Sequence, residues 1–205
     1  MIIAVDGPTA SGKGTIAKAL AAHFGLPHLD TGLLYRAVGR QVALDGGDAD
    51  SGADAEAACG FPDSLLGDPE LRSEAVGGLA SRVSVHAQVR RALYQRQRAF
   101  AMQRGGAVLD GRDIGTVIAP EAEVKLFVVA SVSARSERRF KEMQAAGRSV
   151  SLAEIAADLE LRDQRDRTRA EAPLVAASDA VLLDTSDLSP AAAIAAAIGI
   201  VGARL

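Results

Sequence analysis

Five short apolar runs, separated by longer helix-like patterns, constrain the fold of this 205-residue chain more than any other feature. Near-continuous apolar runs of this length are typical of strands that are buried on both faces of a parallel sheet. Alternating strands and helices predict an α/β fold, with a five-stranded parallel sheet flanked by helices and ligands bound at the carboxyl ends of the strands. The expected strands are residues 2–5, 28–29, 107–109, 124–129 and 180–183, and the expected helices are 13–23, 82–103, 133–146, 151–169 and 191–201.

The composition excludes several classes of protein and site. The formal net charge is −3, whereas a nonspecific nucleic-acid binder needs a basic surface, so we expect no nucleic-acid partner. The single cysteine, Cys59, can form neither an internal disulfide nor a multi-cysteine zinc site, and it fits a reducing compartment. The chain contains no Asn, which excludes N-glycosylation and Cys-His-Asn catalysis.

The sequence contains no segment typical of membrane insertion or targeting. The apolar start of the chain is interrupted by Asp6 and has no basic region before it. The apolar run 191–201 is shorter than the roughly 17–25 residues that span a bilayer. Ser189 and Pro190 are instead typical of the start of a packed helix. We therefore expect no membrane partner, a cytoplasmic location and a monomer.

Charge is unevenly distributed along the chain. Residues 45–70 contain eight carboxylates and no Lys or Arg, so the remainder of the chain is net positive. The segment is also rich in Gly and Ala and contains two Pro. This composition predicts a loose, solvated insertion with weak helical content, not a second hydrophobic core.

A glycine-rich segment follows the first expected strand and leads into the first expected helix. In that context the spacing Gly-x4-Gly-Lys predicts a phosphate-binding loop. Glycines let backbone N–H groups turn toward a phosphate, and the helix N-terminus adds free donors and the positive end of its dipole. The expected triphosphate-binding residues are Gly7, Pro8, Thr9, Ala10, Ser11, Gly12, Lys13, Gly14 and Thr15, with the charge of Lys13 directed to the β- and γ-phosphates.

A hydroxyl at the end of this loop predicts a contact with Mg²⁺. The strict form of the loop has Ser or Thr directly after the lysine. Here Gly14 occupies that position and Thr15 follows. We therefore expect Thr15 to help hold Mg²⁺, directly or through water, with a nucleoside triphosphate as the phosphoryl donor.

Two further polar segments follow expected strands and reach the same edge of the sheet. Residues 30–36 include Arg36, and residues 110–116 include Arg112 and Asp113. A guanidinium is a rigid bidentate donor that suits a phosphate dianion. We therefore expect an acceptor phosphate to bind near the phosphate-binding loop.

A third polar segment, residues 162–169, gathers arginines on one helix face. Helical spacing places Arg162, Arg165, Asp166 and Arg169 on that face and turns Asp163 and Arg167 aside. Three guanidiniums on one face repel each other unless an anion lies among them. A solvated, salt-bridged face is the alternative, but the phosphate-binding loop favours an anion.

The combined residues suit phosphoryl transfer. Its transition state spreads negative charge over the moving phosphoryl group, so catalysis depends mainly on positioning, cationic groups and Mg²⁺. The reaction needs no strong general base. The three histidines are scattered, and no convincing Ser-His-Asp or metal-binding His/Cys set is present.

At these residues the chain resembles the bacterial-type cytidylate kinases, a family of nucleoside monophosphate kinases with a P-loop kinase fold. The discriminating sequence is DGRD, because adenylate kinases share the GKGT ending of the loop but carry an Asp-Gly-Phe-Pro-Arg-like segment at the comparable point. The matching segments, in the family's order and at similar spacing, are 7–15 (GPTASGKGT), 30–37 (DTGLLYRA), 110–120 (DGRDIGTVIAP), 162–174 (RDQRDRTRAEAPL) and 179–186 (DAVLLDTS).

The resemblance implies transfer of the γ-phosphate of ATP to CMP or dCMP. It implies that Arg36, Arg112 and Arg169 hold the acceptor phosphate, that Ser81, Arg90 and Asp113 read cytosine, and that Thr31, Arg162 and Asp166 complete the CMP site near the sugar and phosphates. The implied catalytic residues are Lys13, Arg112, Arg138 and Arg169. A carboxylate that accepts the exocyclic amino group favours cytosine over uracil, which has a carbonyl there.

The resemblance also implies a single domain with three parts. These are a core (1–30, 91–140 and 170–205), an acceptor-binding insertion (31–90) and a lid region (141–169), entered through Arg138 and Arg139. Closure of the lid would expel water from the reacting phosphates. Many relatives carry a longer insertion with a small antiparallel sheet, whereas residues 41–71 here are fewer, acidic and poor in β-branched side chains.

Other functions remain open from the residues alone. The chain could be a P-loop kinase for another small acceptor, such as AMP, UMP or a shikimate-like alcohol. It could also be an ATP-dependent switch without an acceptor. A Ras-type GTPase is excluded, because its guanine-reading motif requires Asn.

Overall fold

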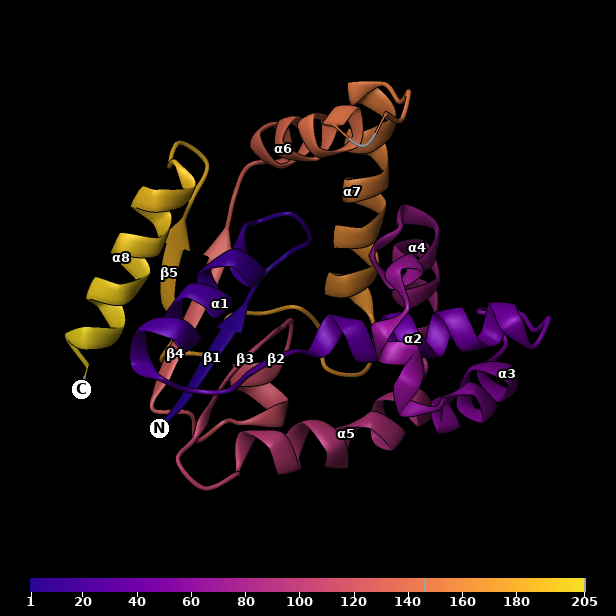
Figure 1. The fold of residues 1–205 in the computed structure, drawn as a ribbon, viewed down its shortest axis with the longest axis horizontal. Helices are drawn as coiled ribbons and strands as arrows, with labels where there is room; N and C mark the ends of the chain where they lie inside the picture. The colour runs from indigo at the N-terminus through magenta and orange to yellow at the C-terminus, as the bar shows by residue number, and fades with distance from the viewer. Residues whose placement is uncertain (146, 205) are drawn as a thin grey trace.

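The computed structural model describes residues 1–145 and 147–204. At its centre lies a five-stranded parallel sheet in the order β2-β3-β1-β4-β5, which confirms the predicted sheet (Figure 1). Strands β1, β2 and β3 end later than predicted, so that Asp6, Asp30 and Asp110 belong to the carboxyl edge of the sheet, and β5 is shifted by one residue. The strands are β1 (Ile2–Asp6), β2 (His28–Asp30), β3 (Ala107–Gly111), β4 (Val124–Val129) and β5 (Val181–Asp184).

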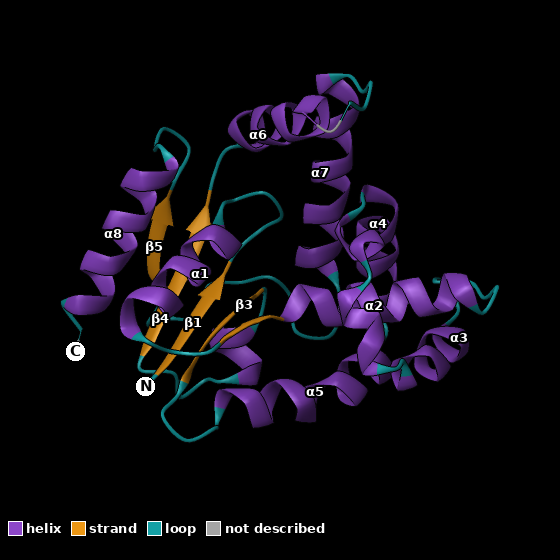
Figure 2. Cartoon of the chain, viewed as in Figure 1, coloured by secondary structure: helices purple, strands orange, loops and turns teal. Residues whose placement is uncertain are grey.

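Helices cover both faces of the sheet and extend well beyond its edge (Figure 2). Residues 114–118 form a single wide turn, η4 (Ile114–Ile118), directly after β3. The α-helices are α1 (Lys13–Phe24), α2 (Thr31–Leu44), α3 (Gly52–Ala57), α4 (Glu74–Val83), α5 (Ala87–Ala101), α6 (Val132–Ala145), α7 (Leu152–Thr168) and α8 (Pro190–Gly202), and three short 3₁₀ helices are η1 (Ala58–Gly60), η2 (Asp63–Gly67) and η3 (Pro69–Arg72).

Two helices differ from the sequence prediction. The segment after β2 was expected to hold site residues and was not among the expected helices, and it forms α2. The single helix expected over 82–103 is broken at residues 84–86, where α4 ends and α5 begins. At the break the hydroxyl of Ser84 donates to the carbonyl oxygen of Ser81 at 3.0 Å, a local bond that competes with helix continuation. The expected helix 133–146 is observed up to Ala145, while Ala146, like Leu205, lies outside the described residues.

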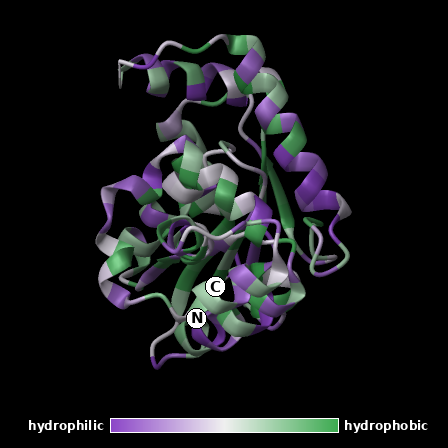
Figure 3. Ribbon diagram, turned by 90° about the vertical axis from the view of Figure 1, so that its right-hand side faces the viewer, coloured by the Kyte–Doolittle hydropathy of each residue, from purple (hydrophilic) through white to green (hydrophobic). Residues whose placement is uncertain are grey.

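Alternate residues of β1 pack on opposite faces of the sheet. Ile3 and Val5 belong to a core formed with α1 and α8, whereas Ile2 and Ala4 belong to one formed with α5 and η4. The hydrophobic colouring of the central strands in Figure 3 agrees with burial on both faces. No helix among residues 1–145 and 147–204 combines the length and the apolar character needed to cross a membrane.

A second hydrophobic core lies away from the sheet, and this corrects the sequence prediction for the acidic segment. Ala49, Ala55, Ala58 and Phe61 of that segment are buried against α2, α4 and α5. The carboxylates of the segment lie mostly on its outer surface while these alanines and Phe61 face inward, so overall composition concealed an amphipathic arrangement. Within the described ranges this region is helical, and the five-stranded sheet holds every strand.

A buried ion pair joins α6 and α7 to the phosphate-binding loop. The guanidinium of Arg135 donates to both carboxylate oxygens of Asp163, at 3.0 and 2.6 Å, and to the carbonyl oxygen of Thr9 at 3.1 Å. Both side chains are at most 8% exposed. The sequence prediction that Asp163 turns aside from the functional face is consistent with this, but it missed that Asp163 faces another helix.

We expect Asp163→Asn to lower the free energy of unfolding by about 3 kcal/mol, because it leaves the Arg135 charge buried without its counter-ion. Glu142→Gln, which removes an exposed partner of Arg139, serves as the control and should change the free energy by less than about 0.5 kcal/mol. Urea unfolding followed by circular dichroism measures both values. Equal losses for the two variants would contradict the structural role of the buried pair.

Candidate functional site

The loop between β1 and α1 has the backbone of a phosphate cradle. Gly7 has a φ of 154°, and a Cβ atom there would lie 2.0 Å from the carbonyl oxygen of Val128 on β4, so a side chain does not fit. Gly12, with a φ of 87°, is the N-cap residue of α1, and it has no side chain that could cap the helix. The N–H groups of the first turn of α1 are thus available to an anion.

Lys13 is held at the centre of this loop. Its Nζ donates to the carbonyl oxygen of Pro8 at 3.2 Å. Burial lowers the pKa of Lys13 to about 8, and the nearby Arg112 acts in the same direction, while Asp110 and Asp30 oppose them. An approaching anion would raise this pKa and so favour the charged form of the lysine.

Two adjoining cavities open at the carboxyl edge of the sheet. The outer cavity, of about 540 Å³, is lined by residues 9–16, by charged side chains and by the apolar Leu188, Pro190 and Ala193. The inner cavity, of about 70 Å³, lies between α2, α4, α5, α7 and residues 111–113 at the end of β3. Residues that line both cavities are Thr9, Gly32, Arg36, Gly111, Arg112 and Arg162.

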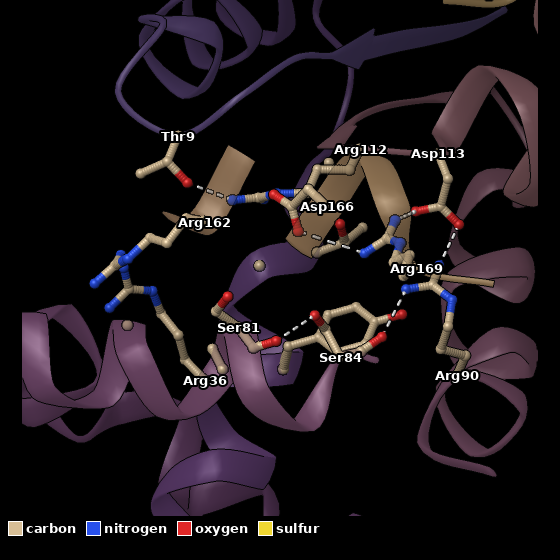
Figure 4. A pocket seen from close by; sticks show the side chains of 16 residues that line it. Thr9, Arg36, Ser81, Ser84, Arg90, Arg112, Asp113, Arg162, Asp166 and Arg169 are labelled. Carbon is tan, nitrogen blue, oxygen red and sulfur yellow. Dashed lines mark hydrogen bonds and ion pairs between the residues drawn. The ribbon is translucent and has the colours of Figure 1, made fainter. Parts of the chain in front are cut away.

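All nine residues predicted to bind the acceptor line the inner cavity. Helix α7 supplies two of them and its C-cap residue, Arg169, is a third; the others come from α2, α4, α5 and the turn after β3 (Figure 4). Sequence segments far apart along the chain are thus brought together as predicted. The nine are Thr31, Arg36, Ser81, Arg90, Arg112, Asp113, Arg162, Asp166 and Arg169.

Two buried carboxylates are shared among three arginines inside this cavity. Asp113 pairs with Arg90 and lies 3.7 Å from the guanidinium of Arg169. Asp166 pairs with Arg112 and lies 3.7 Å from another nitrogen of Arg169. Arg112 also donates to the hydroxyl of Thr9 at 2.5 Å, which links the inner cavity to the phosphate-binding loop. The network orders the guanidiniums around a small polar space.

Arg36 donates to backbone carbonyl oxygens, whereas Arg90, Arg112 and Arg169 contact carboxylates. Its Nη1 donates to the carbonyl oxygens of Leu71 and Ser73, at 2.7 and 2.9 Å. Burial, followed by the charge of Arg162, lowers the pKa of Arg36 to about 10. A Cβ atom at Gly77 would lie 2.9 Å from the Arg36 guanidinium and 3.1 Å from that of Arg162, so the glycine leaves room for both. Two close cations without a shared carboxylate favour an anion between them.

Three aspartates end adjacent strands beside the loop. The carboxylate of Asp6 accepts the N–H groups of Ile114 and Gly115, and burial nevertheless raises the pKa of Asp6 to about 7. Burial, followed by the charge of Asp110, raises the pKa of Asp30, whereas Lys13 lowers it. Asp110 also lies 2.7 Å from the Nε2 of His28. The strand ends therefore concentrate negative charge near Lys13.

The oxygen donors beside the loop fit Mg²⁺. Asp30, Asp110 and Thr15 all line the outer cavity with Lys13, and carboxylate and hydroxyl oxygens are ligands that Mg²⁺ accepts. Repulsion between Asp30 and Asp110, seen in the raised pKa of Asp30, is what a cation would relieve. Within the described residues no group of three or more His, Cys, Asp or Glu could hold a metal alone. This suits an ion that takes its remaining ligands from water and phosphate.

Most of the other predicted site residues line the outer cavity, and three do not. Residues 9–15 of the loop line the outer cavity, as does Arg138, whose guanidinium donates to the hydroxyl of Thr185 at 3.1 Å. Gly7 and Pro8 belong to the loop but do not line either cavity. Arg165 was expected on the same face as Arg162 and Arg169, but it is half-buried and lines neither cavity.

Sequence reasoning missed several residues of the site. Tyr35 lines the inner cavity with its ring 5.5 Å from the guanidinium carbon of Arg90. Glu74 begins α4 and pairs with Arg139 of α6 and Arg162 of α7. The aspartates at strand ends had a readable signal, because each follows an apolar run. No sequence signal identified the partners of Glu74, since they lie more than 60 residues away in the sequence.

Comparisons with known proteins match this chain to one family. The family model described as cytidylate kinase matches residues 3–56 and 63–202. The unmatched residues 57–62 fall within the acidic segment 45–70. A solved structure from Chloroflexus aurantiacus covers 100% of this chain and 97% of its own, but its TM-score of 0.47 and identity of 21% are too low to support an argument.

Curated relatives match over nearly their full length. A cytidylate kinase of Xanthobacter autotrophicus is 55% identical over 204 residues, covering 100% of this chain and 98% of the relative. One from Azorhizobium caulinodans is 55% identical and covers 98% of both chains. One from Cereibacter sphaeroides is 56% identical over 197 residues, covering 96% of this chain and 92% of the relative. On this full-length similarity and the matching family model, the chain belongs to the cytidylate kinase family.

Proposed function

We propose that this protein transfers the γ-phosphate of ATP to CMP or dCMP, giving ADP and CDP or dCDP. The observation that carries the proposal is the inner cavity, in which Asp113 and a cluster of arginines face a small space directly beside the phosphate-binding loop. The core, acceptor-binding insertion and lid, as divided in the sequence prediction, are part of the same proposal. So are the monomeric state and the cytoplasmic location.

The outer cavity suits the donor nucleotide. Its loop offers backbone N–H groups and Lys13 to the phosphates, and its far side offers the apolar surfaces of Leu188, Pro190 and Ala193 to a purine base. Arg138 and Arg139 reach the same cavity from α6, at the start of the proposed lid. Closure of that lid over the triphosphate would exclude water and prevent hydrolysis.

The acceptor phosphate suits the border between the two cavities. Arg36 and Arg112 line both cavities, and Arg169 lies against Asp113 and Asp166 in the inner one. Guanidiniums at this border would hold a dianionic phosphate next to the γ-phosphate of the donor. A bound phosphate would also relieve the repulsion between Arg36 and Arg162.

The inner end of the cavity suits cytosine. The Asp113 carboxylate would accept a hydrogen bond from the exocyclic amino group, with Arg90 and Arg169 fixing its orientation. Uracil would direct a carbonyl oxygen at that carboxylate and leave a buried acceptor unpaired. The buried hydroxyl of Ser81 lacks a hydrogen-bond partner within the described structure, which leaves it available to the nucleotide. Arg162 and Asp166 lie where they would contact the sugar and its neighbouring phosphates.

The reaction requires little covalent chemistry from the protein. An oxygen of the acceptor phosphate attacks the γ-phosphorus while the bond to the β–γ bridging oxygen breaks, so no proton needs to be removed from the nucleophile. Lys13, Arg112 and Arg169 would offset the charge that spreads over the moving group. Mg²⁺, held by Thr15, Asp30 and Asp110, would supply charge neutralisation at the donor phosphates.

An acceptor panel tests the proposed function. We expect ADP release, measured in a coupled assay with ATP, to depend on CMP or dCMP and to be much slower with UMP, AMP or shikimate. Turnover of AMP or UMP that equals or exceeds that of CMP would refute the assignment of the acceptor. ATP binding without any acceptor-dependent ADP release would favour the nucleotide switch.

The lowered pKa of Lys13 predicts proton uptake when ATP binds. In the free protein Lys13 loses its proton above a pKa of about 8. A bound triphosphate places negative charge beside Nζ and raises that pKa, so at about pH 8.5 binding should take up on the order of half a proton. Calorimetry in two buffers of different ionisation enthalpy measures this uptake. Lys13→Met should abolish it, and buffer-independent heats for the unaltered protein would contradict the prediction.

Asp113→Asn tests the base assignment. The asparagine has nearly the same shape but replaces one acceptor oxygen with a donor. We expect kcat/KM for CMP to fall by about 10²-fold, and the ratio of CMP to UMP turnover to fall with it. Steady-state kinetics with both acceptors at saturating ATP measures the ratio. An unchanged ratio would show that Asp113 does not read the base.

A further inference from the structure

Asp6 makes a contact that the proposed reaction does not explain. It is the last residue of β1, its side chain is 5% exposed, and it directly precedes Gly7 of the phosphate-binding loop. Its Oδ1 accepts the N–H of Ile114 at 2.9 Å, and its Oδ2 accepts the N–H of Gly115 at 2.8 Å. Both acceptor oxygens are therefore used on two consecutive backbone groups more than 100 residues away.

Those two backbone groups begin the turn η4, directly after Asp113. Asp113 occupies the N-cap position of η4. An aspartate at such a position ordinarily accepts the free N–H groups of its own turn with its side chain. In the described structure the Asp113 side chain makes no such bond and is directed toward Arg90 and Arg169 instead (Figure 4).

We propose that Asp6 is a positioning residue for base selection: it caps η4 in place of Asp113 and thereby keeps the Asp113 carboxylate available to the acceptor base. Without Asp6, the free N–H groups of Ile114 and Gly115 would compete with the base and with Arg90 for that carboxylate. The inference rests on the proposed role of Asp113 and adds the residue on which that role depends.

The surroundings of Asp6 favour this role. In the sheet register Asp6 is paired with Gly111, so its side chain starts beside the strand that leads into Asp113. A Cβ atom at Gly115 would lie 3.1 Å from the side chain of Lys125 and 3.5 Å from Oδ2 of Asp6, so the glycine lets the turn approach the carboxylate closely. The two hydrogen bonds from Ile114 and Gly115 to Asp6 thus hold the backbone that follows Asp113, while β3 holds the backbone that precedes it.

The isosteric variant Asp6→Asn tests the inference. Its amide can accept one N–H group but presents a donor to the other, so one backbone N–H becomes free to bond Asp113. We expect the ratio of kcat/KM for CMP to that for UMP to fall by at least about 10-fold, with KM for ATP changed by less than about 3-fold. Assays at about pH 8 keep Asp6 ionised, since its pKa is about 7.

Two controls separate positioning from a loss of stability. Asp163→Asn removes another buried carboxylate that accepts two hydrogen bonds, and it should lower stability while leaving the CMP-to-UMP ratio unchanged. If Asp6→Asn does not fold, Asp6→Glu keeps a carboxylate but moves it by one methylene, and the same fall in the ratio is expected. A fall for Asp163→Asn equal to that for Asp6→Asn would overturn the inference.

A double-mutant cycle distinguishes failure of this inference from failure of the proposed function. If Asp6 acts through Asp113, Asp6→Asn should cause no further fall in the ratio when Asp113→Asn is already present. An unchanged ratio in Asp113→Asn alone would refute the base assignment itself. A fall in Asp113→Asn with an unchanged ratio in Asp6→Asn, or additive effects in the double variant, would overturn only the role of Asp6.

Discussion

Sharing of a few buried carboxylates among many arginines is the interaction on which the rest of the site depends. Asp113 and Asp166 each contact two guanidiniums, and Arg169 lies between them. An unpaired buried charge costs several kcal/mol, so guanidiniums can be gathered in one cavity only if carboxylates accompany them. The compensation is incomplete at Arg36, whose partners are backbone carbonyls. That residual positive charge distinguishes a phosphate site from a structural ion-pair network.

The sheet determines where these charges meet. Parallel pairing brings the carboxyl ends of β1, β2 and β3 together, and each of these strands contributes an aspartate near its end. Arg112 follows β3 directly, whereas Arg36, Arg90 and Arg162 come from helices that pack beyond this edge, with α7 lying against both α4 and α6 (Figure 1). Helix α7 therefore joins the two cavities, because Arg162 lines both of them. The distance between donor and acceptor sites is set by packing of whole elements, not by a single flexible loop.

Features that depend on local pattern could be predicted from the sequence, and features that depend on distant partners could not. The five strands and the phosphate-binding loop follow from apolar runs and glycine spacing, and the acceptor residues follow from a family resemblance whose segments the fold brings together. The second core was missed because the buried alanines of residues 49–58 are hidden in an acidic composition. The ion pair of Asp163 was missed because its partner, Arg135, lies on another helix. Periodicity identifies a helix face, but only packing decides what that face contacts.

The same reasoning explains why β1 couples the two halves of the site. Its last residue, Asp6, holds the turn that follows Asp113, and the next residue, Gly7, begins the loop that would bind the donor phosphates. Gly7 in turn lies against the carbonyl oxygen of Val128 on β4, so neither side of this junction can shift alone. A displacement of β1 would therefore move the phosphate-binding loop and the turn after Asp113, the residue proposed to read the base, together. Phosphoryl transfer depends on the alignment of two substrates. A strand that is shared by both binding sites maintains that alignment more directly than independent adjustment of each site would.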